Sequence, residues 1–98
     1  MDIKELRDGL RGVSVEGEIV SVSPRRTVSK RDGGTSEVAD AVLKDDSGTV
    51  KVSLWDEQIE QVSKGARVSI ANGYVSTFRG ERQLSIGRYG TLSVQDSL

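Results

Sequence analysis

The sequence of 98 residues contains no cysteine and no histidine, and only four of its side chains are aromatic. The lack of cysteine excludes disulfide bonds and thiolate metal sites, and the lack of histidine removes the commonest general base and metal ligand. We therefore expect a protein that is not an enzyme, with no catalytic residue, no metal, no other cofactor and no small-molecule substrate.

Long apolar runs and an excess of charge are also missing. No stretch approaches the roughly 18 consecutive apolar residues of a membrane-spanning helix, and the start of the chain, MDIKELRDGL, lacks the apolar run of a signal peptide. We expect a soluble, cytoplasmic protein without a membrane partner, and its length fits one domain over 1–98. Because the formal net charge is −1, any nucleic-acid site must come from where the charges cluster.

Short runs of valine, serine and threonine between glycine-containing turns predict an all-β domain with small helical pieces. One of these pieces is expected at the N-terminus. The spacing of Asp2 and Glu5 is that of a capping box, and the apolar stripe that follows predicts a short helix at 3–10.

The first strand is expected at 13–23, and its apolar alternation changes phase after Gly17. A glycine together with a change of phase indicates a bulge or sharp coil. Such a bend would let one long strand contribute to both halves of a closed barrel. The alternative is a strand that ends near Glu18.

The order of the remaining elements points to one architecture. They are a strand at 37–44, a turn at 45–48, a strand at 50–55, a helix at 57–63 capped by Asp56, a strand at 66–76 disturbed at Asn72-Gly73, and a strand at 82–87. We interpret Asp45 and Asp46 as turn formers and not as a metal pair, since no third ligand is near them in sequence. A coiled first strand, two more strands, a short helix and two further strands match the five-stranded Greek-key barrel of the OB-fold.

The strand that begins at residue 50 carries the one tryptophan on its polar side. Alternation places Val50, Val52 and Leu54 on one face and Lys51, Ser53 and Trp55 on the other. In an OB-fold the ligand lies across the second and third strands, between the loop that joins strands one and two and the loop that joins strands four and five. The sequence therefore puts Trp55 on the expected binding face.

Two further rings and two basic segments border that face. Tyr74 and Phe78 fall at the end of the fourth strand and in the loop after it. The first loop is expected at 24–36, as a loop or a flexible hairpin tip. The basic residues are Arg25, Arg26, Lys30 and Arg31 in this first loop and Arg79 and Arg82 in the second. A ring on a barrel face can stack on a nucleobase, worth roughly 1–3 kcal/mol per base, while basic side chains neutralise phosphates. Two alternatives stay open: the helix at 57–63 buries Trp55, and 24–36 is simply a solvated loop.

Several motifs resemble the archaeal single-stranded DNA-binding proteins of the simple, single-OB type and the OB domains of archaeal replication protein A. They are the DDSG turn at 45–48 before a strand ending in Leu-Trp, the KGARVSI strand at 64–70, the pair Tyr74 and Phe78, and LSIGRYG at 84–90. The resemblance covers about 12–94. It implies base stacking by Trp55, Tyr74 and Phe78, contacts from the first basic loop, and a role in DNA replication, recombination or repair.

The sequence also departs from that family. Tyr74 stands where crenarchaeal members often have tryptophan, which implies weaker stacking. The chain stops at VQDSL without the tail that recruits partners in many members, so either it is a domain of a longer protein or its partner contacts lie elsewhere.

Three functions remain open at this point. The first is binding of single-stranded DNA without strong sequence preference. The second is binding of RNA, which would use the same rings and differ in contacts to the 2′-hydroxyl. The third is docking to other replication protein A subunits or repair proteins, with Trp55 and Phe78 as interface anchors.

Overall fold

The computed structural model describes residues 1–86 and 90–95, apart from the side chain of Phe78. Residues 87–89 of the LSIGRYG segment and the last three residues lie outside this description. The elements are η1 (Ile3–Glu5), β1 (Arg11–Val22), β2 (Arg26–Ser29), β3 (Thr35–Asp45), β4 (Gly48–Trp55), α1 (Glu57–Gln61), β5 (Arg67–Phe78), β6 (Glu81–Ser85) and β7 (Thr91–Gln95). Among the described residues, no helix is long and apolar enough to cross a membrane.

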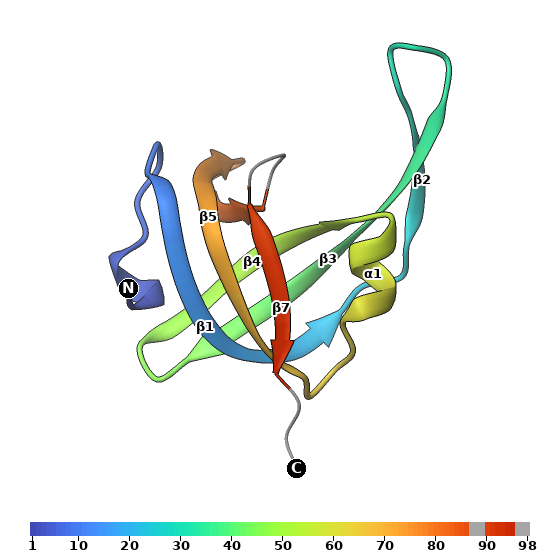
Figure 1. Cartoon of the computed structure of the whole chain (residues 1–98). Coiled ribbons are helices and arrows are strands. Elements are labelled where there is room, and N and C mark those ends of the chain that lie inside the picture. Colours follow the sequence, from blue (N-terminus) through green and yellow to red (C-terminus); the bar gives the residue numbers. More distant parts are fainter. Residues whose placement is uncertain (87–89, 96–98) are drawn as a thin grey trace.

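Five of the strands close into a barrel, as the sequence predicts (Figure 1). The order around it is β1, β3, β4, β6 and β5, and β1 also pairs with β5 to close the circle. All of these pairings are antiparallel except the parallel pair of β4 and β6. Two strands are additional: β2 pairs with β3 in a hairpin that extends beyond the barrel, and β7 pairs with β5.

The first strand serves both halves of the barrel. Residues from Arg11 to Glu18 pair with β5, and residues from Glu18 to Val22 pair with β3, with a change of register between Ile19 and Ser21. Gly17 is buried at the bend, where an added Cβ would collide with the backbone carbonyl of Lys44. The expectation of a coiled first strand is therefore confirmed, and the alternative of a strand ending near Glu18 is wrong.

The core is built from the inward-facing residues of the barrel strands, closed at its ends by η1 and α1. The alternation expected in β3 and β4 is confirmed, since Ala39, Ala41, Val52 and Leu54 are almost completely buried. The core cluster consists of Ile3, Leu6, Val13, Val15, Ile19, Ala39, Ala41, Leu43, Val50, Val52, Leu54, Ile59, Val62, Val68, Ile70, Val75, Leu84 and Ile86.

Several element boundaries differ from the sequence-based expectation. The segment 24–36, expected as a loop or a flexible hairpin tip, is a hairpin that contains β2 and the turn at 30–34 leading into β3. Strand β5 continues past residue 76 to Phe78, and the expected loop after it is a tight turn in which Arg79 and Gly80 both have positive φ. Strand β7 is not predicted, because its alternation is short and its side chains are mostly exposed.

The two predicted helices are both shorter than expected, and neither is capped by the side chain of its aspartate. Helix α1 ends at Gln61, and its N-cap residue Asp56 has a φ of 50° and no side-chain capping bond. The Asp56 carboxylate instead accepts the N–H of Glu37 at 2.9 Å, which extends the pairing of β3 and β4. The N-terminal helix is a single 3₁₀ turn, and Asp2 does not cap it.

The N-terminal turn is held by Asp45, which lies in the turn between β3 and β4. Its Oδ2 accepts the N–H of Ile3 at 2.9 Å, and its Oδ1 accepts bonds from the hydroxyl and N–H of Ser47 and from the N–H of Gly48. Partial burial acts to raise the pKa of Asp45, but these hydrogen bonds outweigh it and lower the pKa to about 2. Asp45 thus fixes Ile3, a core residue, against the barrel.

We expect Asp45→Asn to destabilise the domain by about 1–2 kcal/mol at pH 7, after allowance for solvent screening. The folded-state pKa lies below the usual value of an aspartate, so this stabilisation is complete above the unfolded-state pKa and is lost as the pH falls toward about 2. Urea unfolding at several pH values measures the difference. Asp46→Asn is the control, since Asp46 is exposed beside it. An equal effect of Asp45→Asn at pH 7 and pH 2 would contradict the account.

Candidate nucleic-acid interface

The outer face of the sheet formed by β3, β4, β6 and β5 carries one continuous row of polar side chains. Asp40 pairs with Ser53, Ser53 with Ser85, and Ser85 with Tyr74. On the far side of β5, Arg11 of β1 is the partner of Tyr74. Directly paired residues present their side chains on the same face of a sheet, so this row crosses the barrel wall from β3 to β1.

A groove of about 420 Å³ lies on this face. We call it the polar groove, and its lining consists of Ser53, Trp55, Gln58, Tyr74, Gln83 and Ser85. Trp55 and Tyr74 are each 45% exposed, which is unusual for rings of their size. The groove therefore combines two accessible rings with four uncharged hydrogen-bonding side chains.

Trp55 is the last residue of β4 and stands opposite Val38 of β3. Val38 has the same alternation as the outward-facing Asp40, yet it is only 3% exposed and lies outside the core cluster. Side chains on the outer face must therefore shield part of Val38 from solvent, and Trp55 is the direct neighbour of Val38 on that face. Because almost half of Trp55 remains exposed, the alternative that α1 buries this ring is wrong.

Tyr74 faces outward because β5 contains a bulge. Gly73 pairs with Val13, but the next pair along is Ile70 with Val15, so β5 has an extra residue at this point. Asn72 takes up the distortion with a φ of 59°. Strict alternation from Ile70 would turn Tyr74 into the core, whereas the bulge puts Val75 inside and Tyr74 outside. The disturbance expected at Asn72-Gly73 is confirmed.

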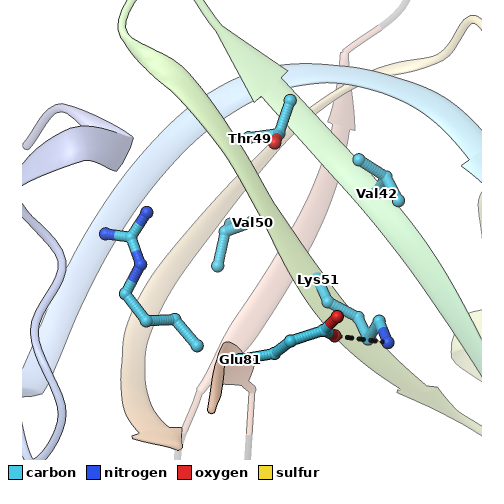
Figure 2. Close-up of a pocket in the computed structure, with 6 residues that line it drawn as sticks. Val42, Thr49, Val50, Lys51 and Glu81 are labelled. Atoms are coloured by element: carbon cyan, nitrogen blue, oxygen red, sulfur yellow. Dashed lines mark hydrogen bonds and ion pairs between the residues drawn. The ribbon is translucent and has the colours of Figure 1, made fainter.

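A second hollow, of about 350 Å³, lies beside the polar groove and contains an ion pair (Figure 2). The Nζ of Lys51 is 3.0 Å from a carboxylate oxygen of Glu81. The hydrogen bond and the charge of Glu81 raise the pKa of Lys51. Lys51 also pairs with Gln83, which lines the polar groove, so the two hollows are neighbours on one face.

The cations at the opposite border are paired with carboxylates as well. A guanidinium nitrogen of Arg25 is 2.8 Å from Glu37 and 3.8 Å from Glu60. Arg26 lies opposite Val38 and reaches Asp40 at 3.3 Å. The side chains of this border are all partly exposed, so phosphate oxygens can compete with the carboxylates for the same donors.

The structure does not bring the remaining predicted basic residues into the polar groove. Lys30 and Arg31 lie at the tip of the projecting hairpin, where neither side chain forms an ion pair with any described residue (Figure 1). Arg79 lies in the turn after β5. Arg82 donates to the backbone oxygens of Ile3 and Leu6 at 3.3 and 2.8 Å, which anchors the N-terminal segment. The side chain of Phe78 lies outside the description, although its backbone pairs with Glu81.

Four residues on this face are absent from the set of site residues predicted from the sequence. Gln83 and Ser85 were recognisable as outward-facing by alternation in their strand, but uncharged polar residues give no specific signal. Gln58 reaches the groove from α1, and its Oε1 accepts the N–H of Trp55 at 3.0 Å. Arg11 is placed beside Tyr74 by strand pairing that no local pattern reveals.

Comparison with known proteins gives consistent matches. The chain is 26% identical over 85 residues to the single-stranded DNA binding protein Ssb of Saccharolobus solfataricus, covering 87% of this chain and 57% of that protein. It is 35% identical over 88 residues to replication factor A of Methanothermobacter thermautotrophicus, covering 89% of this chain and 11% of that protein. The chain thus spans little more than half of the first relative and a small part of the second.

A solved structure also resembles this chain over its whole length. The second OB-fold domain of replication protein A from Methanococcus maripaludis superposes with a TM-score of 0.80 at 27% identity, covering 100% of this chain and 97% of that one. A family model described as single-stranded DNA binding protein Ssb-like, OB fold, matches residues 10–94, which is most of the chain. The protein therefore belongs to the Ssb-like family of single-stranded DNA-binding OB-fold domains.

Proposed function

We propose that the domain binds single-stranded DNA, without strong sequence preference, along the face that holds the polar groove, and that it does so in the cytoplasm during DNA replication, recombination or repair. The proposal rests mainly on the presence of Trp55 and Tyr74, each almost half exposed, in one groove lined otherwise by uncharged polar side chains. Membership of the Ssb-like family supports the same ligand.

Base stacking supplies most of the proposed binding energy. Each base stacked on a ring contributes roughly 1–3 kcal/mol whichever base it is. The border cations add less, because a phosphate that binds Lys51, Arg25 or Arg26 must first replace a carboxylate. The exchange of one exposed anion for another is close to neutral in free energy.

The exposed apolar surface favours nucleic acid over protein docking as the main role. Among the described residues, the large exposed hydrophobic side chains are Met1, Trp55, Tyr74 and Val94. Two of these line the polar groove, whereas Met1 precedes η1 and Val94 lies on β7. Contacts to other replication protein A subunits or to repair proteins would then be secondary to DNA binding, as would binding of RNA by the same rings.

We expect Trp55→Ala to reduce the affinity for oligo-dT by roughly 1–3 kcal/mol, because one stacking platform is lost. Folding stability should change by less than about 1 kcal/mol, since the ring is outside the core and covers only part of Val38. Calorimetric titration and urea unfolding measure the two quantities. Val94→Ala is the control, because Val94 is also exposed but lies on β7. Loss of stability without loss of affinity would show that Trp55 is structural.

The border ion pairs make a separate prediction about salt. If Lys51, Arg25 and Arg26 contact phosphates, the logarithm of the binding constant falls against the logarithm of the salt concentration with a slope of roughly −2, from about −0.7 per contact. A binding constant that does not change with salt would contradict these contacts.

Glu81→Gln removes the carboxylate partner of Lys51 and should strengthen oligo-dT binding by roughly 2- to 5-fold. Glu16→Gln, on β1, makes the same change in net charge away from the groove. Equal gains in the two variants would mean that only net charge matters.

A further inference from the structure

The amide of Gln58 has its orientation fixed by the backbone. Its Oε1 accepts the N–H of Trp55 at 3.0 Å, and a backbone N–H can only donate. The carboxamide oxygen must therefore face β4. The NH₂ group is the end that remains for the polar groove, which Gln58 lines from α1.

We propose that Gln58 is a specificity-determining residue that donates a hydrogen bond from this NH₂ group to a base oxygen and so gives the groove a preference for thymine over adenine. The inference rests on the proposed binding of single strands and adds to it a base preference. Gln58 is three residues from Trp55 and lines the same groove, so a base stacked on Trp55 presents its edge to the amide.

The preference follows from the groups on each base edge. Both exocyclic oxygens of thymine are acceptors, so an NH₂ donor finds a partner on either side of the ring. Adenine has ring-nitrogen acceptors, but its exocyclic position, where thymine has an oxygen, carries an amino group that is itself a donor. When that group faces the Gln58 NH₂, two donors meet and both lose the hydrogen bonds they made to water.

The other polar side chains of the groove do not impose the same choice. The hydroxyl groups of Ser53 and Ser85 can donate or accept. The amide of Gln83 has both a donor end and an acceptor end, and the structure shows no hydrogen bond that fixes it. These side chains can therefore adapt to either base and can accept the N3–H of thymine. Of the four polar side chains in the groove, Gln58 is the one with a fixed donor.

The test is Gln58→Glu with Gln61→Glu as the matched control. The glutamate at position 58 can still accept the N–H of Trp55, but it presents an oxygen to the groove in place of NH₂. Gln61 is exposed on the same helix, so Gln61→Glu introduces the same charge without touching the groove. Fluorescence anisotropy of labelled oligo-dT and oligo-dA of equal length gives the ratio of the two dissociation constants for each variant. Thermal melts verify that each variant is folded.

We expect Gln58→Glu to weaken oligo-dT binding by roughly 3- to 10-fold more than oligo-dA binding, because the thymine contact is lost. Gln61→Glu should weaken the binding of oligo-dT and oligo-dA equally and leave the ratio of the two dissociation constants unchanged. Gln58→Ala should also shift the ratio toward adenine. An unchanged ratio in both Gln58 variants would overturn the inference and leave Gln58 as a residue that only positions Trp55. Failure of the unmodified protein to bind either strand would instead overturn the proposed function.

Discussion

The bulge in β5 is the constraint on which the groove depends. At Asn72 and Gly73 one extra residue enters the strand, and Asn72 adopts a left-handed backbone to accommodate it. Before the bulge β5 pairs with β1 and β7, and after it Gly73 and Tyr74 still pair with β1 while the residues from Tyr74 to Phe78 pair with β6. The distortion reverses which side chains of β5 face the core, and so it turns Tyr74 outward. A regular β5 would place Tyr74 in the core.

Under the proposed function, the charges on this face suit a site that depends on stacking more than on electrostatic attraction. At the borders of the groove, Arg25 is paired with Glu37 and Lys51 is paired with Glu81. The chain as a whole has a net charge of −1. A polyanion therefore has to compete with carboxylates for Arg25, Arg26 and Lys51, whereas Arg11, beside Tyr74, forms no ion pair with any described residue. Under the proposed function, a ligand gains most from offering base faces to Trp55 and Tyr74, and a ligand that offers only phosphates gains little.

Features encoded in local alternation were predictable from the sequence, and features that depend on distant pairing were not. The outward position of Trp55, the bend near Gly17 and the barrel order all follow from period-two patterns and turn residues. The N-terminal helix was overestimated because Asp45, 42 residues from Ile3, supplies the hydrogen bond that holds a single turn. The contacts of Arg82 with the backbone oxygens of Ile3 and Leu6 were not predictable, because no sequence pattern displays such partners.

Trp55 is the sole tryptophan, so its fluorescence reports directly on the proposed binding face. The most direct measurement is a titration of this fluorescence with oligo-dT and with a DNA duplex of the same length, at one salt concentration. Stacking on Trp55 predicts strong quenching and tight binding with oligo-dT and much weaker binding with the duplex, because a duplex hides its base faces. Equal or tighter binding of the duplex, or binding of oligo-dT without any change in Trp55 fluorescence, would contradict the account.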